Sequence, residues 1–482
     1  MISEPRQPTF FESIIPIIFL ILLLSLNVFV FSDDATYGSN QIALLLAATF
    51  AALLAARQGY KWKDIIDGIV KSISSAMAAI LILLLIGALA GTWLISGIVP
   101  ALIYYGLSVL NPTIFLFAAV IVSAIVSIAT GSSWTTAATV GIALVGIGQT
   151  MGINEGVVAG AIISGAYFGD KMSPMSDTTN LAPAMAGTDL FTHIRYMAYT
   201  TVPSITITLV IFLIWGFTID STAQLDTINT VQAAILSKFN INMWLFLVPL
   251  VVVIMIVRRI PALPALLTGT LLGGVFAIVF QPDIVLAVAG ETEAGFYSFY
   301  EGVMRAMYEE TSVATGNATV DDLLSAGGMY GMMNTIWLIL CAMIFGGVME
   351  KAGMLRRLAN YIIQFANSNG SLVTSTAITC GFMNITASDQ YLAIVVPGRM
   401  FNNAYKERGL APENLSRTLE DSGTVTSVLV PWNTCGAYQA GVLGVATFSY
   451  LPFAFFNLIS PLMTIFFAYA NIKIRKLKDG DK

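Results

Sequence analysis

Residues 169–180 read Gly-Asp-Lys-Met-Ser-Pro-Met-Ser-Asp-Thr-Thr-Asn, and Leu-Ala-Pro follows at 181–183. This polar stretch ends an apolar, Gly/Ala-rich run at 156–169, and ionisable side chains at membrane depth are costly and usually functional. Pro174 and Pro183 lack backbone N–H groups and leave carbonyl oxygens without helical partners, so the stretch predicts a broken helix. Its Asp, Ser, Thr and Asn side chains are oxygen ligands of the kind that hard cations prefer.

The composition of the whole chain is that of a membrane protein rather than a soluble enzyme. Of its 482 residues, 56% are hydrophobic and only 11% are charged, whereas soluble domains carry roughly a quarter charged residues. The formal net charge is −5, and the sequence has no basic stripe of the kind that nucleic-acid binding requires. Three cysteines lie far apart in apolar runs, which predicts small buried side chains rather than disulfides or a metal site: Cys341, Cys380 and Cys435.

Apolar runs of membrane-spanning length recur along the chain. They predict an all-α polytopic membrane protein with about 11 to 13 membrane elements, several of them short or broken. The first run could be the core of a signal peptide, but it lacks a small-residue cleavage site, so a spanning helix is favoured. The runs occupy residues 14–31, 41–56, 73–95, 113–129, 134–151, 156–169, 197–217, 243–257, 261–280, 333–349, 371–384, 424–447 and 450–472.

The positions of Lys and Arg orient these elements, because basic loops stay on the cytoplasmic side of a membrane. The stretch 281–322 holds eight Asp and Glu residues and the single basic residue Arg305, so it is predicted to lie outside. Both termini are then predicted to be cytoplasmic. The basic clusters behind this orientation lie at 57–71, 258–259, 351–357, 399–417 and 473–482.

The two halves of the chain match each other weakly but in a constant order. Asp64 matches Asp322, and Asp170 matches Asp421. The charge of matching loops changes sign, which predicts two inverted repeats, the architecture of many secondary transporters. Periodic hydrophobic blocks, as in any polytopic protein, are the alternative explanation. The first predicted repeat is 58–217, with a re-entrant hairpin near 130–136 and a broken helix near 170–183. The second is 321–472, with a hairpin near 384–390 and a broken helix near 431–436. The predicted remainder consists of N-terminal helices at 1–57, connecting helices with the acidic outer loop at 218–320, and a basic cytoplasmic tail at 473–482.

The two predicted hairpin tips supply candidate cation ligands, Ser132 and Ser133 in the first and Ser388 and Asp389 in the second. Such tips expose carbonyl groups, hydroxyl groups and helix-end dipoles, which can hold a dehydrated Na⁺. Irregular backbone at membrane depth is tolerated only where protein or a water-filled cavity satisfies it. An ordinary surface turn with Ser and Thr caps is the alternative.

Asp170 and Asp177 of the opening stretch are the candidate carboxylates for a site shared by Na⁺ and a proton. Burial favours the protonated carboxyl and a bound cation favours the ionised one, so the two ions compete, which is sufficient for antiport. Lys171 is expected to pair with one of these two carboxylates. A solvated loop at the cytoplasmic surface is the alternative. The other oxygen ligands expected here are Thr178, Thr179 and Asn180.

A last polar interruption offers Asn433 and Thr434 as oxygen ligands beside a helix break at Pro431. By the inverted-repeat argument, it is expected to face the opening stretch across the site. Glu420 and Asp421 precede it and are expected to cap a helix near the cytoplasmic surface.

Two further features are expected to be structural. Four glycines at helical spacing form a small-residue face that lets helices approach closely: Gly156, Gly160, Gly165 and Gly169. His193, the single histidine, lies beside a charged residue just before an apolar run, so a loop position is expected, with pH sensing as the alternative.

Segments 130–134, 146–148, 159–183 and 431–434 together resemble the signature of the NhaC-type Na⁺/H⁺ antiporter family. The resemblance spans most of the chain. It implies an antiporter of a bacterial or archaeal cytoplasmic membrane, related to the ion-transporter superfamily, with a scaffold and a moving transport domain. It implies no cofactor beyond the transported Na⁺ and H⁺. The sequence does not fix the oligomeric state, although a homodimer is common among carriers that need a fixed scaffold.

Other readings of the same residues stay open at this point. Some members of the family couple uptake of malate and protons to release of lactate and Na⁺. Arg399 would suit the carboxylate of such a substrate, but it also fits the pattern of basic residues that mark cytoplasmic loops. An intramembrane protease is disfavoured because the Gly-x-Gly-Asp and Tyr-Asp motifs of the aspartyl type are absent. A passive channel is harder to exclude, but two inverted halves with buried carboxylates favour a carrier.

Overall fold

The structure is a computed structural model that describes residues 5–31, 35, 37–109, 111–219, 225–258, 260–315 and 318–477. The end of the predicted basic tail, at 478–482, lies outside the described residues, as do 220–224 and 316–317 of the predicted connecting region. The described chain is almost entirely helical, which confirms the predicted all-α class. One short ribbon pairs β1 (Thr311–Ser312) with β2 (Ser325–Ala326) in antiparallel register.

The helices follow one another along the chain with few long connections. They are α1 (Phe10–Phe31), α2 (Ser39–Arg57), α3 (Trp62–Ile95), α4 (Ile98–Val109), α5 (Pro112–Thr130), α6 (Ser133–Thr136), the π-helical η2 (Ala137–Gly141), α7 (Ile142–Thr150), α8 (Glu155–Met172), α9 (Asp177–Ala186), α10 (Leu190–Gly216), α11 (Leu225–Lys238), the 3₁₀ segment η3 (Met243–Phe246), α12 (Leu247–Val257), α13 (Ala262–Phe280), α14 (Pro282–Ala289), α15 (Phe296–Tyr308), α16 (Ala318–Leu323), α17 (Gly328–Gly331), α18 (Met333–Lys351), α19 (Met354–Ile363), α20 (Asn369–Thr386), α21 (Gln390–Glu407), α22 (Pro412–Leu419), the π-helical η4 (Glu420–Thr424), α23 (Val425–Ser427), α24 (Thr434–Leu443), α25 (Thr447–Tyr450), the 3₁₀ segment η5 (Leu451–Phe453) and α26 (Phe455–Tyr469).

Seven helical stretches among the described residues are long and apolar enough to cross a membrane, or up to nine if each of two sharply bent pairs is one span. The predicted range of about 11 to 13 elements also included short or broken segments, whereas a complete span requires roughly 20 apolar residues. Helices α8 and α20 are two of those elements, and their polar residues explain part of the difference.

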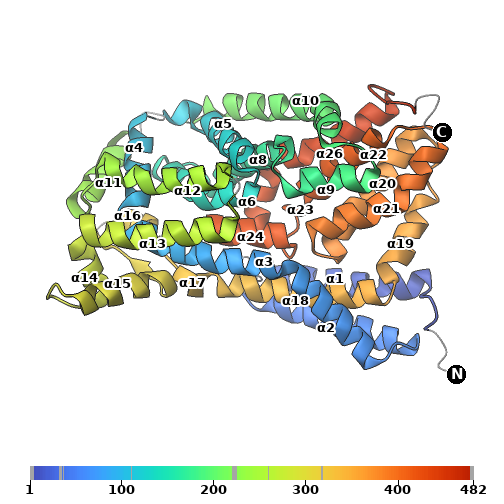
Figure 1. Ribbon diagram of the computed structural model, residues 1–482, viewed down its shortest axis with the longest axis horizontal. Coiled ribbons are helices and arrows are strands. Elements are labelled where there is room, and N and C mark those ends of the chain that lie inside the picture. Colours follow the sequence, from blue (N-terminus) through green and yellow to red (C-terminus); the bar gives the residue numbers. More distant parts are fainter. Residues whose placement is uncertain are drawn as a thin grey trace.

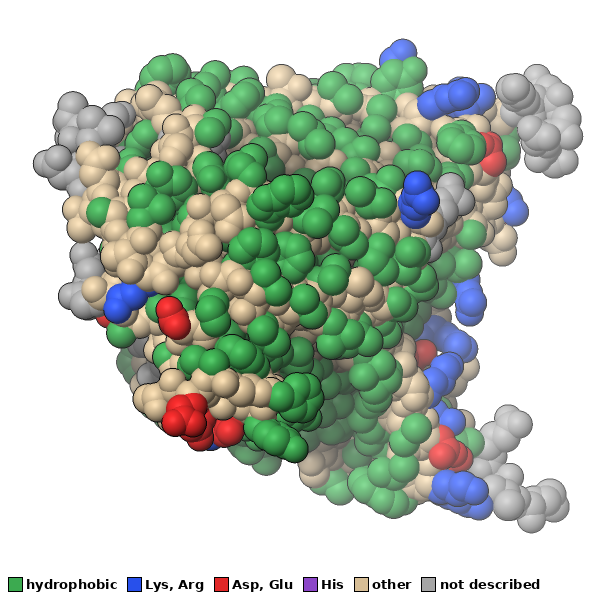
Figure 2. Space-filling model, turned by 60° about the vertical axis from the view of Figure 1, so that its left-hand side comes forward, with side chains coloured by type: hydrophobic (Ala, Val, Ile, Leu, Met, Phe, Trp, Pro, Cys, Tyr) green, Lys and Arg blue, Asp and Glu red, His purple; other side chains and the backbone are tan. Residues whose placement is uncertain are grey.

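The two ends of the molecule differ in charge. Figure 1 shows α3, α13 and α18 along the longest axis, with α14 and α15 of the acidic stretch at one end and α19 and α22 at the other. In Figure 2, Lys and Arg side chains gather at the end opposite most of the acidic ones, and hydrophobic side chains cover much of the surface between. An apolar belt between polar ends, together with the spanning helices, makes this a multi-pass membrane protein.

The predicted helix breaks are present. Residues 131–132 separate α5 from the run formed by α6, η2 and α7, and 173–176 separate α8 from α9. Residues 387–389 separate α20 from α21, and 428–433 separate α23 from α24. The inverted relation between the two halves stays a prediction.

The first two breaks touch each other. Gly131 ends α5 in the left-handed conformation, with φ 70°, which glycine adopts without strain. A Cβ atom at this position would lie 2.7 Å from the Cβ atom of Met175, in the α8–α9 break. The approach therefore leaves no room for a side chain at residue 131.

Close packing of α8 brings its end to the first break. A Cβ atom on Gly165 would lie 2.2 Å from the carbonyl oxygen of Val120, and one on Gly169 would lie 2.5 Å from that of Ala124, both on α5. The other two glycines of the predicted face, at 156 and 160, approach Ser449 and Phe453 instead. The packing role is thus confirmed, but the glycines serve two neighbouring segments rather than one.

Candidate ion-binding site

Asp170 lies in the last turn of α8 and caps the helix that begins after the first break. Its Oδ2 atom accepts hydrogen bonds from the backbone N–H of Ser133, at 3.1 Å, and from the Ser133 hydroxyl, at 2.7 Å. The residue is 9% exposed. Ser133 starts α6, and the same helical run continues to Thr150, so the carboxylate faces the positive end of a helix dipole.

Lys171, the next residue, is fully buried and faces a different part of the protein. Its ammonium group pairs with the carboxylate of Asp421 and donates to the Ser460 hydroxyl at 2.9 Å. Asp421 also accepts a hydrogen bond from Thr200 at 2.7 Å. The expected pairing of Lys171 with Asp170 or Asp177 is therefore not what the structure shows. Consecutive helical residues point roughly 100° apart, so Asp170 and Lys171 reach different neighbours.

Glu420 and Asp421 are both fully buried, which corrects the expectation that they cap a helix near the surface. They lie in the π-helical segment η4, inside the continuous helix from α22 to α23 rather than at its end. One carboxylate oxygen of Glu420, Oε1, accepts from the Thr178 hydroxyl at 3.0 Å. The other, Oε2, is buried without a hydrogen-bond partner among the described residues. Single π-helical turns of this kind are frequent at functional sites.

The buried charges of this region do not cancel. Asp170, Glu420 and Asp421 contribute three carboxylates, whereas Lys171 and Arg417 contribute two cations, of which Lys171 pairs with Asp421 and Arg417 pairs with no carboxylate among the described residues. Uncompensated buried charge is strongly unfavourable unless a proton or a cation neutralises it. Two carboxylates of this interior, on Asp170 and Glu420, are therefore buried without an ion-pair partner among the described residues.

No group of three or more His, Cys, Asp and Glu side chains in the described part of the chain could hold a metal ion together. A cation at Asp170 would therefore rely on one carboxylate with hydroxyl and carbonyl oxygens around it. Such oxygens are the usual ligands of hard cations. The three cysteines are buried, which confirms the prediction of small buried side chains: Cys341, Cys380 and Cys435.

The structure divides the other residues of the opening stretch into two groups. Thr178 and Thr179 are buried, and the Thr179 hydroxyl lies 3.2 Å from the carbonyl oxygen of Asp170. Asp177 and Asn180 are exposed at the start of α9. Asp177 accepts a 3.4 Å hydrogen bond from Tyr391, and Asn180 donates to nearby backbone carbonyls. The two threonines are therefore buried with Asp170 and Glu420, whereas the side chains of Asp177 and Asn180 are not.

The second hairpin is held by polar contacts within its own half. Asp389 caps α21 by accepting a 2.9 Å hydrogen bond from the backbone N–H of Leu392. Ser388 has a φ of 59°, which non-glycine residues rarely adopt, and its buried hydroxyl has no partner among the described residues. Its carbonyl oxygen accepts from the backbone N–H of Thr434 at 3.0 Å, and Asn433 caps α24.

The two interrupted helices meet each other through α24 and α6. The Tyr438 ring stacks on Trp134 with centroids 4.0 Å apart, and its hydroxyl donates to the Trp134 carbonyl at 3.0 Å. Gln439 donates weakly, at 3.5 Å, to the carbonyl of Ser133. Ser133 therefore connects Asp170 with the second half of the chain. Sequence reasoning missed Gln439, although a lone amide inside an apolar run was a usable signal.

His193 lies elsewhere than expected, and Arg399 has the exposed position of a basic loop residue rather than that of a buried carboxylate partner. His193 is buried on α10 rather than in a loop, with its Nδ1 atom 2.8 Å from the Ser416 hydroxyl. His193 lies in the first turn of α10, which starts directly after Asp189, because the Asp189 side chain caps the helix by accepting from the backbone N–H of Thr192. Arg399 is exposed on α21, so the structure does not bring it to the buried carboxylates.

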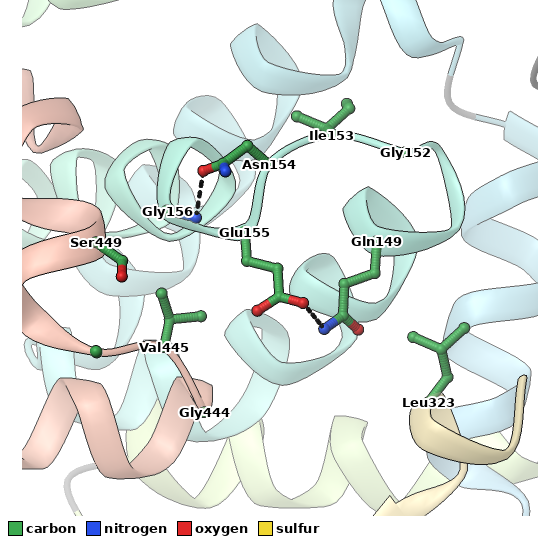
Figure 3. Close-up of a pocket in the computed structure, with 11 residues that line it drawn as sticks. Gln149, Gly152, Ile153, Asn154, Glu155, Gly156, Leu323, Gly444, Val445 and Ser449 are labelled. Atoms are coloured by element: carbon green, nitrogen blue, oxygen red, sulfur yellow. Dashed lines mark hydrogen bonds between the residues drawn. The ribbon is translucent and has the colours of Figure 1, made fainter. Parts of the chain in front are cut away.

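A separate cavity of about 790 Å³ lies at the opposite end of α8. Figure 3 shows Glu155, at the start of α8, bonded to Gln149 across this cavity at a distance of 2.7 Å. The C-terminal ends of α7 and α24 also border it, through Gln149 and Gly444. The helical run from α6 to α7 therefore begins with Ser133, which contacts Asp170, and its last turn borders this cavity.

Interrupted helices that meet in the interior, with ionisable groups at the breaks, are the arrangement of secondary transporters. The chain belongs to the Na⁺/H⁺ antiporter family, whose family profile matches residues 165–472. It is 39% identical to the Na⁺/H⁺ antiporter NhaC of Alkalihalophilus pseudofirmus, over 90% of each chain. It is 37% identical to the malate-2H⁺/Na⁺-lactate antiporter of Bacillus subtilis, over 97% of this chain and 96% of that one. The arginine/ornithine antiporter ArcD of Halobacterium salinarum is 34% identical, over 99% and 95%.

Proposed function

We propose that this protein exchanges Na⁺ for H⁺ across the cytoplasmic membrane, with Asp170 as the carboxylate that binds either ion. The observation that carries the proposal is the position of Asp170, buried at a helix break with both hydrogen bonds on Oδ2. Neither of these bonds uses the Oδ1 atom, which we propose as the ligand of the cation or the proton, with the Ser176 hydroxyl beside the same carboxylate. Since one carboxylate cannot hold both ions, binding of one releases the other.

Hydroxyl and carbonyl oxygens around the breaks complete the proposed cation site. Ser132 and Ser133 begin α6 beside the C-terminal end of α5, whose carbonyl groups form the negative end of a helix dipole. Thr178 and Thr179 approach from the α8–α9 break. From the second half we propose Ser388, Asp389, Asn433 and Thr434, with the unpartnered Ser388 hydroxyl as the support.

Glu420 is proposed as a second proton-binding group. Its Oε2 atom is buried without a partner, and a protonated carboxyl group is much less costly to bury than an ionised one. Lys171 and Asp421 neutralise each other, and we propose that they hold α8 against η4 so that Asp170 stays at Ser133. The pair would then act through position rather than by binding the transported ions.

The charge of the two ends supports an orientation in which the basic end, near α19 and α22, faces the cytoplasm. Alternating access would expose Asp170 first to one side and then to the other. Sodium-linked exchange of organic acids, with malate and protons entering and lactate and Na⁺ leaving, is the second candidate, supported by the relative from Bacillus subtilis.

The test is a pH-gradient dequenching assay in everted membrane vesicles, started by adding Na⁺. Asp170→Asn should reduce Na⁺-dependent proton flux to below about one-hundredth of wild type, as expected for loss of a proton-transferring group. Asp67→Asn, at an exposed carboxylate on α3, is the control and should retain wild-type flux. Asp177→Asn measures whether the exposed carboxylate contributes. Undiminished flux in Asp170→Asn would overturn the proposal, and adding malate or lactate separates the two exchange reactions.

A further inference from the structure

Arg417 is a buried positive charge that the ion site does not use. It lies on α22, its side chain is fully buried, and its Nε and Nη2 atoms have no hydrogen-bond partner among the described residues. The Nη1 atom reaches the carbonyl oxygen of Lys473 at 3.5 Å, a weak contact. The guanidinium carbon lies 4.7 Å from the centre of the Tyr196 ring. Aromatic contact supports the cation but does not neutralise it.

Three acids lie about one helical turn from Arg417, and none of them forms an ion pair with it: Glu413, Glu420 and Asp421. Asp421 pairs with Lys171 instead. Glu413 lies four residues earlier on α22, and its Oε1 atom pairs with Arg475 at 2.8 Å. None of the ion pairs found among the described residues includes Arg417. A buried arginine without a carboxylate partner is costly, so this position favours an anion.

The free atoms of Arg417 have the geometry of an anion-binding fork. Nε and Nη2 lie on one edge of the planar guanidinium group, and their two N–H bonds match the two oxygens of a carboxylate. Asp421 and Glu420 follow on the same continuous helix, about one turn further into the protein. An anion at Arg417 would therefore lie about one helical turn from Glu420, the proposed second proton-binding group.

We propose that Arg417 binds the carboxylate group of a small organic acid that this protein transports. The inference deepens the proposed function, because it adds an organic anion to the Na⁺ and H⁺ exchanged at Asp170. It also replaces the expectation that Arg399 would meet such an anion, since Arg399 is exposed.

The site is closed towards the basic end by the C-terminal segment 471–477. Tyr196 donates to the carbonyl of Lys473, and Asn414 donates to that of Arg475 at 2.7 Å. The backbone N–H of Ala411 also donates to the Arg475 carbonyl, at 3.0 Å. The structure thus corresponds to a conformation in which Arg417 is shielded, and entry of an anion from this end requires the segment to move.

The experiment measures binding of malate and of lactate to the purified full-length protein by calorimetry, with inorganic phosphate as a separate arm. Wild type should bind a carboxylate, and Arg417→Gln should bind it at least about tenfold more weakly, because two charge-assisted hydrogen bonds are lost. Arg357→Gln, at an exposed arginine on α19, is the control and should bind as wild type does. Binding of phosphate alone, or equal binding by wild type and Arg417→Gln, would overturn the inference.

A second variant covers the case in which Arg417→Gln does not fold. Arg417→Lys keeps the charge but lacks the planar fork, so it should also bind the carboxylate about tenfold more weakly. Equal affinity in Arg417→Lys and wild type would overturn the bidentate geometry. Absence of any carboxylate binding by wild type would overturn the inference while leaving the Na⁺-driven flux through Asp170 to be judged by its own assay.

Discussion

An aspartate accepts hydrogen bonds at the start of both α6 and α21, but the two aspartates come from different places. Helix α6 has Ser132 as the N-cap from its own turn, and Asp170 is added to it from another helix. Asp170 reaches Ser133 from a separate helix, α8, and accepts hydrogen bonds from its backbone and its hydroxyl. Asp389 belongs to the turn that it caps and accepts from Leu392, three residues later. A cap from the same turn is part of local folding, whereas a cap from another helix depends on how that helix is positioned.

The difference suggests separate roles for the two carboxylates. Asp389 resembles an ordinary N-cap, which stabilises a helix by about 1 kcal/mol. Asp170 is held in place by the close packing of α8 on α5 and by the ion pair of the adjacent Lys171. In our proposal, its Oδ1 atom takes the cation or the proton without unfolding the turn that contains Asp170. The first break then supplies the exchanging carboxylate of the proposed ion site, and the second break supplies further oxygen ligands.

The largest expected effect comes from removing the ion pair that positions α8. Lys171→Met leaves Asp421 as an unpaired buried carboxylate and should lower the free energy of unfolding by about 3–5 kcal/mol. The double variant Lys171→Met with Asp421→Leu removes both charges and should recover most of that loss. Unfolding of the purified proteins in detergent measures both values. Equal losses in the single and double variants would show that the pair does not position α8 as described.

Removing Asp389, the N-cap of α21 after the second break, should lower the free energy of unfolding by less than removing Lys171 does. Asp389→Ala should lower the free energy of unfolding by about 1 kcal/mol and keep Na⁺-dependent proton flux above about one-tenth of wild type. Asp389→Asn can still accept the hydrogen bond from Leu392 and serves as the matched control. The vesicle assay compares both with Asp170→Asn. If Asp389→Asn lost flux as completely as Asp170→Asn, the two breaks would be equivalent and the comparison would fail.

The smallest expected effect is at Ser388, where φ is 59°. Ser388→Gly should raise the free energy of unfolding by about 0.5–1 kcal/mol, because glycine adopts this conformation without strain. Ser388→Ala keeps the strain and removes the same hydroxyl. If the hydroxyl is a cation ligand, both variants should need more Na⁺ for half-maximal flux, although only the glycine variant gains stability. An unchanged Na⁺ requirement in both would remove Ser388 from the site.

The sequence predicted the features that depend on local chemistry. The prolines and polar residues of 169–183 indicated a broken helix, and the resemblance of this segment to a known family indicated the class of transporter. The pairing of Lys171 with Asp421, 250 residues apart in the chain, could not be predicted, because it depends on how α8 packs against η4. The burial of Glu420 was missed for a related reason, since charged residues next to a basic segment usually mark a surface.

The central claim is that Na⁺ and H⁺ compete for Asp170, and equilibrium binding of ²²Na⁺ to the purified protein at a series of pH values tests it directly. In the acidic range, each unit decrease in pH should weaken apparent Na⁺ affinity by about tenfold in wild type, because one proton displaces one cation. Asp170→Asn should lose this binding, whereas Asp67→Asn should reproduce the wild-type curve. Na⁺ affinity that is independent of pH in wild type, or unchanged in Asp170→Asn, would contradict the account.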